Sequence, residues 1–314
     1  MIDFRYHIVS LVAVFLALAL GLFLGSTSLQ STVTHSLRQQ ANRVTADNQS
    51  LENQKDTLNA ELSTQQAFAS AVEPFAVSGR LVDAGVAVVS APGVDSGARS
   101  ALMTTLASAG ATVTANVQLQ SSYLDPDQDD TLGQLAQQLA GTRRLPHADG
   151  AVQAATELAR ALVARPGLRT PSSRQIDTIL STLSDGNMIT IQGDPPAHPA
   201  DLAVLLVPLG SAPDGSAAAV QQDSDLIGMA TALRRDSSGV VVASPTLQSG
   251  ANNGVLPSIR QDSSLSATVS TVDSDETPIG RIATVLALSQ APAGTTGQYG
   301  ASQKQPLPTV SPSP

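Results

Sequence analysis

The sequence has no cysteine and no tryptophan, and its only lysines are Lys55 and Lys304. Without cysteine, a disulfide framework, a thiolate metal site and a lipid-modified cysteine anchor are all excluded. The net charge of −9 leaves no basic surface to displace the counterions of nucleic-acid phosphates, so we expect no nucleic-acid partner. Because aromatic residues make up only 3% of the chain, stacking surfaces for bases or sugars are not expected either.

Several signatures of catalysis and ligand binding are also missing. The chain has no GxGxxG, GxxxxGK or GxSxG sequence. The acidic run at residues 125–130 lacks the glycine and the glutamate that a calcium-binding EF-hand loop requires, which favours a solvated loop. The histidines never have the spacing of metal ligands; they are His7, His35, His147 and His198. We therefore expect a protein that is not an enzyme and has no evident cofactor or metal, with a triad assembled only by folding as the alternative.

An uncharged apolar run at residues 8–24, IVSLVAVFLALALGLFL, is the most prominent feature of the sequence. As a helix it would extend about 26 Å, which is close to the thickness of a membrane's hydrocarbon core. A cleaved signal peptide with Ser26 and Ser28 at the cleavage site is the alternative, but the length of the run favours an anchor. Arg5 precedes the run, and no lysine or arginine follows it before Arg38. This predicts a single-pass protein of the plasma membrane, whose residues 1–28 form the cytoplasmic tip and membrane helix and whose remainder is extracytoplasmic.

A long polar helix is predicted to follow at residues 29–76, because no glycine or proline occurs there before Pro74. Apolar residues recur every seven positions at Leu37, Val44, Leu51 and Leu58, and a second heptad series consists of Ala41, Asn48, Lys55 and Leu62. This pattern favours a parallel two-stranded coiled coil and hence a homodimer. A single amphipathic stalk that packs on its own domain is the alternative.

From residue 77 onward, short apolar runs alternate with helical patterns, which is typical of an α/β domain with a mainly parallel sheet and flanking helices, similar to flavodoxin or Rossmann folds. The predicted strands are residues 86–89, 112–115, 188–191, 202–207, 240–243 and 268–272. The predicted helices are residues 96–109, 132–139, 151–163, 173–183, 223–233 and 279–288. The domain is expected to end near residue 300, and the proline-rich residues 301–314 are expected to be a disordered tail.

Polar residues at the carboxyl ends of these strands form the candidate site. Ser90, Gly93, Ser244 and Asp273 lie at or just after predicted strands, and Arg281 lies one turn into the last predicted helix. Open α/β sheets bind ligands at such strand ends, so a pocket is predicted there. Capping of helix N-termini explains the same polar residues without a ligand. A deep polar pocket at these strand ends would favour an external enzyme or a sugar-binding module.

Two segments carry a resemblance to a known family. They are the N-terminal FRYHIVSLVAVFLALALGLFLG and the C-terminal TVDSDETPIGRIATVLAL with the following GQYG. Together they resemble the actinobacterial copper-transport family MctB, from residue 1 to about residue 300. The resemblance implies a role in copper homeostasis or resistance, copper as the ligand, and a description as a pore-forming outer-membrane protein. It carries over no copper-binding residue.

Some relatives in this family are instead linked to cell separation beside a membrane partner. The resemblance thus also implies an alternative, a noncatalytic scaffold of the cell envelope with an envelope or division protein as its partner. The sequence itself shows one apolar helix and α/β alternation, and it lacks the ten-residue alternating segments of a membrane β-barrel.

Overall fold

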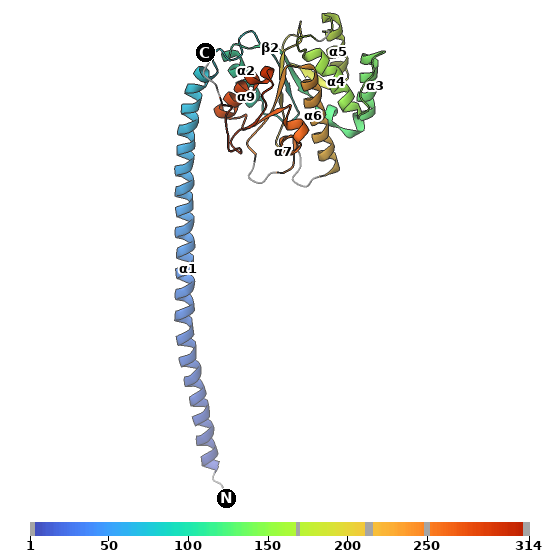
Figure 1. Ribbon diagram of the computed structural model, residues 1–314. Coiled ribbons are helices and arrows are strands. Elements are labelled where there is room, and N and C mark those ends of the chain that lie inside the picture. The colour runs from blue at the N-terminus through green and yellow to red at the C-terminus, as the bar shows by residue number, and fades with distance from the viewer. Residues whose placement is uncertain (1–3, 168–169, 211–215, 248–251, 310–314) are drawn as a thin grey trace. The chain divides into compact units, whose positions relative to one another are not determined.

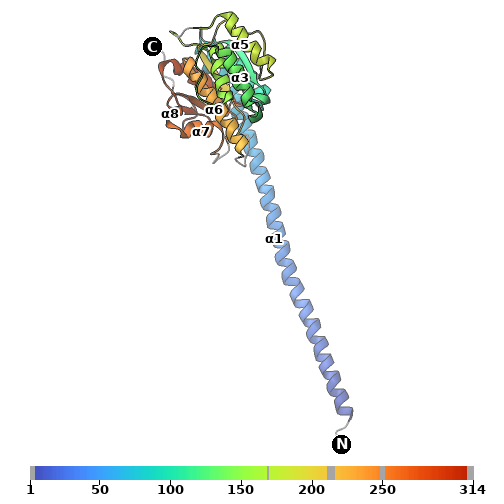
Figure 2. The ribbon, with the colours of Figure 1, turned by 90° about the vertical axis from the view of Figure 1, so that its right-hand side faces the viewer.

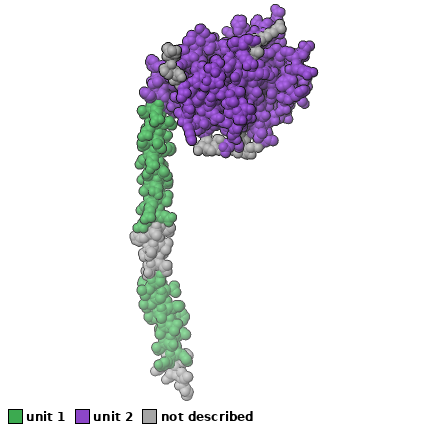
Figure 3. Space-filling view, viewed as in Figure 1, with its two compact units in different colours: residues 1–65 green, residues 66–314 purple. Residues whose placement is uncertain are grey.

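The computed structural model describes residues 4–167, 170–210, 216–247 and 252–309, with the side chains of residues 4–5 and 26–37 outside that description. The chain divides into two compact units, residues 1–65 and residues 66–314 (Figure 3). Each unit is described by itself below.

A single helix, α1 (Phe4–Val77), contains the predicted membrane segment and the predicted stalk (Figure 1). Its stretch Tyr6–Gly25 has a mean hydropathy of 2.7 and is long and apolar enough to cross a membrane. The prediction of an N-terminal apolar helix is confirmed, in a form that suits a membrane anchor or a signal sequence. All described side chains between residues 6 and 65 are exposed.

The end of α1 belongs to the second unit, because its last turns bury side chains against the domain. Ala69, Glu73 and Val77 are buried there, whereas Phe68 and Phe75 are exposed. Val77 is part of a hydrophobic core that also contains residues of the sheet. The division between the units therefore falls before these turns, and not at the end of the helix.

The second unit is built on one sheet of seven strands in the order β3-β2-β1-β4-β5-β6-β7. All neighbouring pairs are parallel except β2 and β3, which are antiparallel. The strands are β1 (Gly85–Ser90), β2 (Thr112–Leu119), β3 (Ile189–Ile191), β4 (Leu202–Leu206), β5 (Gly239–Ser244), β6 (Ser270–Asp273) and β7 (Gln298–Tyr299). The prediction of an α/β fold with a mainly parallel sheet is confirmed.

Helices cover both faces of this sheet (Figures 1 and 2). One core contains the end of α1 with α2 (Ser96–Ser108) and α9 (Pro278–Gln290), which pack on Val86 and Val88 of β1. The other core packs on Ala87 and Val89 of the same strand, since successive strand side chains point to opposite faces. Its helices are α3 (Asp129–Ala140), α4 (Gly150–Leu162), α5 (Ser173–Asp185), α6 (Ala217–Asp236) and α7 (Val255–Gln261). Continuous apolar runs such as residues 202–206 are explained by burial on both faces.

Several elements differ from the sequence prediction or were not predicted. The predicted short strand at residues 112–115 is the eight-residue β2, and α6 begins six residues before its predicted start. The elements that were not predicted are η1 (Ser121–Leu124), η2 (Pro126–Gln128), α7, α8 (Ser263–Ser266), η3 (Ala291–Ala293) and β7. Within the expected tail, Ser302 and Thr309 hydrogen-bond to the domain, and residues 310–314 lie outside the described residues.

Candidate functional site

The order of the strands reverses between β1 and β4, because β1 is followed by β2 on one side and by β4 on the other. Ser90 ends β1, and the backbone N–H of Ala91 donates to the carbonyl oxygen of Leu206 at the end of β4, at 2.9 Å. Gly93 follows with a φ of 83°, and a side chain there would face Pro208 at 3.8 Å. Two predicted site residues, Ser90 and Gly93, therefore lie at the point where open α/β sheets most often bind ligands.

The polar group of Ser90 is nevertheless used inside the domain. Its side chain is fully buried, and its Oγ donates to the carbonyl oxygen of Val117 at 3.4 Å. The same Oγ accepts a hydrogen bond from Nη1 of Arg99 at 3.2 Å, and Arg99 also donates to Gln118 at 3.1 Å. This arrangement ties α2 to the first two strands.

Asp273, the last residue of β6, is the centre of a buried ion-pair network. Its side chain is 0% exposed and lies 3.0 Å from Nη1 of Arg260 on α7. Asp273 also accepts hydrogen bonds from the Ser302 hydroxyl, the Ser302 backbone N–H and the Ser274 hydroxyl. Burial alone would raise the pKa of Asp273, but these hydrogen bonds and the charge of Arg260 outweigh it and hold the pKa below its ordinary value.

Arg260 extends this network to the edge of the sheet. It donates to the Thr271 hydroxyl at 2.9 Å and to the carbonyl oxygen of Tyr299 on β7 at 2.9 Å. Burial lowers the pKa of the guanidinium, and Asp273 acts in the opposite direction. The network thus joins α7, β6, β7 and the segment after β7. It holds the edge of the sheet together.

Arg281 has different partners and holds the end of α1. Its Nε and Nη2 donate to the two carboxylate oxygens of Glu73, each at 2.8 Å. Thr105 on α2 donates to the same carboxylate, and Arg281 also donates to the carbonyl oxygen of Glu276 at 3.1 Å. A two-pronged ion pair of this kind is directional and strong, so α1, α2 and α9 are fixed to one another here.

Ser244 ends β5 and lies opposite Asp273 in the register of the two strands. Its Oγ donates to the carbonyl oxygen of Pro245 at 3.0 Å, and its own carbonyl oxygen accepts from the N–H of Asp275 at 3.0 Å. Asp275 is 2% exposed, and its buried Oδ1 has no hydrogen-bond partner among the residues that the structure describes. Burial, together with the charges of Glu276 and Asp95, raises the pKa of Asp275 to about 7.

In the loop that follows β6, backbone segments approach one another too closely for side chains to lie between them. Ser274 has a φ of 72°, which L-residues rarely adopt. A side chain at Gly280 would overlap the carbonyl oxygen of Ser274, and one at Gly300 would overlap both the carbonyl and the carboxylate of Asp273. The glycines of the TPIGR and QYG segments are therefore required by space.

The structure places the five predicted residues at or beyond the carboxyl ends of the strands, but in different networks. Asp273 and Ser244 are neighbours, Ser90 and Gly93 lie near the reversal point, and Arg281 binds Glu73. Sequence reasoning missed Glu73, Arg260 and Ser302, because each meets its partner only through folding. Thr277 caps α9, because its Oγ1 accepts a hydrogen bond from the N–H of Gly280 at 3.1 Å.

Candidate copper ligands are dispersed in the described part of the chain. Within it, no group of three or more histidine, cysteine, aspartate or glutamate residues is arranged to hold a metal ion. Met188 and Met229 are buried in one core, and the sulfur of Met103 accepts a hydrogen bond from Asn116 at 3.2 Å.

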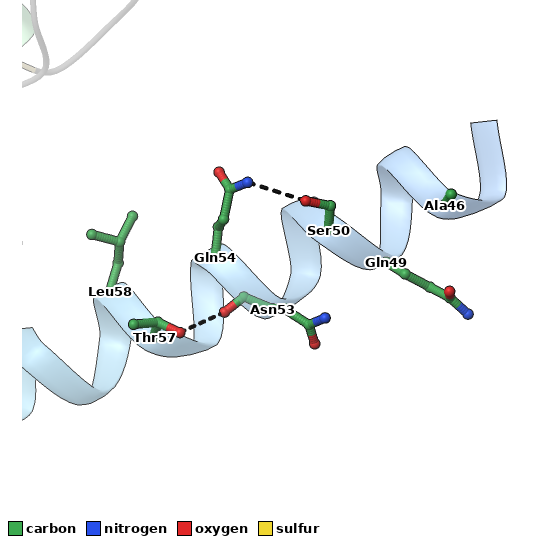
Figure 4. Close-up of a pocket in the computed structure, with 7 residues that line it drawn as sticks. All are labelled: Ala46, Gln49, Ser50, Asn53, Gln54, Thr57 and Leu58. Carbon is green, nitrogen blue, oxygen red and sulfur yellow. Dashed lines mark hydrogen bonds between the residues drawn. The ribbon is translucent and has the colours of Figure 1, made fainter. Parts of the chain in front are cut away.

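A shallow groove lies along one side of α1 within the first unit (Figure 4). Gln54 donates to Ser50 at 3.2 Å there, and Thr57 donates to the carbonyl oxygen of Asn53 at 2.9 Å. Leu58 lies at the same groove and is 64% exposed. The groove is formed by one exposed helix surface, and it encloses no site in the described chain.

Comparison with known proteins covers almost the whole chain. Residues 1–309 match the family model described as "Copper transport outer membrane protein, MctB". Proteins named "Copper transporter MctB" from Mycobacterium tuberculosis and Mycobacterium bovis are 30% identical over 319 residues, which covers 99% of this chain and 100% of each relative. The protein of the same name from Mycobacterium leprae is 30% identical over 311 residues and 96% of both chains. A match of this extent, spanning the apolar helix, the remainder of α1 and the α/β domain, shows that the chain belongs to the MctB copper transport family.

Proposed function

We propose that this protein acts in copper homeostasis or copper resistance at the cell envelope. The observation that carries the proposal is the family match over residues 1–309, together with relatives named as copper transporters at 30% identity over their full length. The resemblance in both terminal segments supports the same role. The proposal concerns the cellular function and assigns no copper ligand to a particular residue.

The proposed molecular form is a noncatalytic, single-pass protein of the plasma membrane with its α/β domain outside the cytoplasm. The apolar stretch Tyr6–Gly25 supports an anchor, and Arg5 before it supports a cytoplasmic N-terminus. A noncatalytic role is supported by the strand-end residues, since Ser90, Asp273 and Arg281 are all held in internal hydrogen bonds.

We further propose that two copies associate through α1, in the coiled coil predicted from Leu37, Val44, Leu51 and Leu58. The side chain of Leu37 lies outside the described residues. Val44, Leu51 and Leu58 are 54%, 62% and 64% exposed, so their apolar surface is available to a second helix. The same exposed seam supports the alternative function, a scaffold of the cell envelope that binds an envelope or division protein.

The copper role is tested by deleting the gene in its native host. Deletion is expected to lower the copper concentration that the cells tolerate and to raise their copper content, measured by elemental mass spectrometry. Expression of this chain should restore both values, and expression of the Mycobacterium tuberculosis relative serves as the positive control. Unchanged tolerance together with unchanged copper content would reject the copper role.

The alternative is tested separately by chemical crosslinking in intact membranes followed by affinity purification. Recovery of a division or envelope protein by the wild type, with loss of that protein in a Leu51→Lys and Leu58→Lys double variant, would favour the scaffold. Recovery of this chain alone would reject it.

A further inference from the structure

A second polar site in the domain is formed by residues other than the predicted strand-end residues. It is a cavity of about 250 Å³ between the segment after β2, the start of α4 and the first half of α6. Its lining consists of Tyr123, Asp125, Pro126, Asp129, Asp149, Ala151, Gln221 and Asp225, and we call it the acidic pocket. Four of its eight lining residues are aspartates, and no lysine, arginine or histidine lies among them.

Asp225 is the buried carboxylate of the acidic pocket. The residue is 4% exposed, and its Oδ1 accepts one hydrogen bond, from Nε2 of Gln221 at 3.1 Å. Its Oδ2 receives no hydrogen bond from any residue that the structure describes. Burial raises the pKa of Asp225 to about 6, and the charges of Asp129 and Asp149 act in the same direction. One carboxylate oxygen of Asp225 is therefore left to accept hydrogen bonds from a bound group.

The other aspartates of the acidic pocket bind only neutral donors. Asp149 accepts from the same Nε2 of Gln221 at 3.0 Å, and Asp129 accepts from the N–H of Ala151 at 3.0 Å. Asp125 accepts from the N–H of Asp127 at 3.0 Å. Among the ion pairs of the described residues, none includes any of the four aspartates that line the pocket.

Three other buried carboxylates of the domain are paired with arginine, whereas Asp275, like Asp225, forms no ion pair among the described residues. Glu157 has a fully buried side chain and lies 2.6 Å from Arg143, with Arg160 at 3.5 Å. Glu73 and Asp273 likewise each pair with an arginine. Buried charges are normally paired in this way, because an unpaired one loses its hydration without compensation. Asp225 lacks such a partner but faces a cavity, so a cation can reach it from outside.

We propose that the acidic pocket binds an organic cation that donates N–H hydrogen bonds, a guanidinium or a primary ammonium group. Such a group can donate to Asp225 Oδ2 and to the neighbouring carboxylates at once, and charge-assisted hydrogen bonds of this kind are the strong ones. The volume of about 250 Å³ accommodates a basic side chain or a small amine. A bare metal ion fits less well, because no three acidic residues of the described chain converge as metal ligands. This inference is independent of the copper role.

The test uses the full-length chain in detergent micelles and argininamide as the probe, titrated by calorimetry. Citrullinamide is the matched control, because its urea group has the same shape as the guanidinium but no charge. Both amides are acetylated on the α-nitrogen, which removes the ammonium group that they would otherwise share. We expect argininamide to bind at one saturable site and citrullinamide not to bind. A peptide with a single central arginine and a small diamine are titrated in parallel, and the tighter of the two shows whether the natural cation is a protein side chain or a free amine.

Two variants and a control define the site. Asp225→Asn keeps the shape of the side chain and is expected to weaken argininamide binding by about tenfold or more, since it removes a charge-assisted bond. Asp149→Asn should weaken it less. Asp223→Asn, on the same helix but outside the pocket lining, should leave it unchanged. Absence of argininamide binding to the wild type, equal binding of citrullinamide, or unchanged binding in Asp225→Asn would each overturn the proposal.

Discussion

The exposed part of α1 and the α/β domain use the same apolar residues in opposite ways. Leu51 on α1 is 62% exposed, whereas Leu205 in β4 is fully buried between two layers of helices. The domain buries its apolar residues within one chain, and the described side chains of residues 6–65 on α1 are exposed. The membrane anchor and the second helix proposed above would each cover one part of this exposed apolar surface.

The largest effect is expected where the domain depends on a buried charge pair. Arg260→Met should lower the free energy of unfolding of the domain by about 3–5 kcal/mol, because Asp273 is left buried without its cation. Arg235→Met removes a surface pair with Asp236 and should cost about 0–1 kcal/mol. Urea unfolding followed by circular dichroism measures both. Equal stabilities of the two variants would show that the Asp273 network contributes no more than a surface pair.

Truncation of one leucine in each region tests the comparison directly. Leu205→Ala should lower the free energy of unfolding by about 2–5 kcal/mol through loss of buried contacts and formation of a cavity. Leu51→Ala should change the unfolding of the domain by less than about 0.5 kcal/mol, because the side chain contacts solvent. Thermal and urea unfolding monitored at the domain give both values. A cost for Leu51→Ala similar to that for Leu205→Ala would mean that α1 packs on the domain of its own chain.

The pH dependence of stability should report the buried carboxyl of Asp275. Its folded-state pKa of about 7 lies above the ordinary value of 3.8, so the folded state retains a proton that the unfolded state has lost between these values. Stability should therefore fall as the pH rises through this window. Asp275→Asn should reduce this fall, and the remainder is expected from Asp225, whose folded-state pKa of about 6 also lies above the ordinary value. The variant should be more stable than the wild type above the window, by about 1–3 kcal/mol.

The control for this measurement is Asp127→Asn, at an exposed residue of η2. It should leave the pH profile of the wild type unchanged. A wild-type profile that is flat between about pH 4 and pH 7, or one that Asp275→Asn does not alter, would contradict a protonated Asp275.

The smallest effect on the domain is expected from a charge in the heptad seam. Leu58→Lys should abolish association of the full-length chain without a measurable change in domain unfolding, because Leu58 is 64% exposed. Sedimentation in detergent gives the state of association. Ala60→Lys places the same charge outside both heptad series and should leave the association intact. A monomeric wild type, or a dimeric Leu58→Lys variant, would reject the proposed coiled coil.

Sequence patterns predicted most of the sheet because its strands are continuous apolar runs. They did not predict that β3 runs antiparallel, since an apolar run has no direction along the sheet. β2 was predicted too short because its polar residues alternate with apolar ones beyond residue 115. β7 has only two residues, and it lies at the edge through parallel pairing with β6, so no local pattern marks it.

The strand-end residues could be named from the sequence, but their partners could not. Arg281 contacts Glu73, which lies 208 positions earlier in the chain. Asp225 approaches Asp149 through Gln221 only because α6 packs on α4. Neither contact produces a periodic pattern or a characteristic residue spacing in the sequence. The acidic run at residues 125–130 was interpreted as a solvated loop, and two of its aspartates line the acidic pocket.

Gly280 and Gly300 have a consequence for how relatives of this protein are recognised. Both glycines permit backbone segments to meet where any side chain would collide, and Arg281 beside the first of them fastens one helix to another. Gly280, Arg281 and Gly300 belong to the two C-terminal sequence segments by which the chain resembles its family. A genome search that begins from these two sequence segments will therefore retrieve proteins that share these backbone contacts and the Arg281–Glu73 ion pair. It will do so whatever ligand or partner each of those proteins binds.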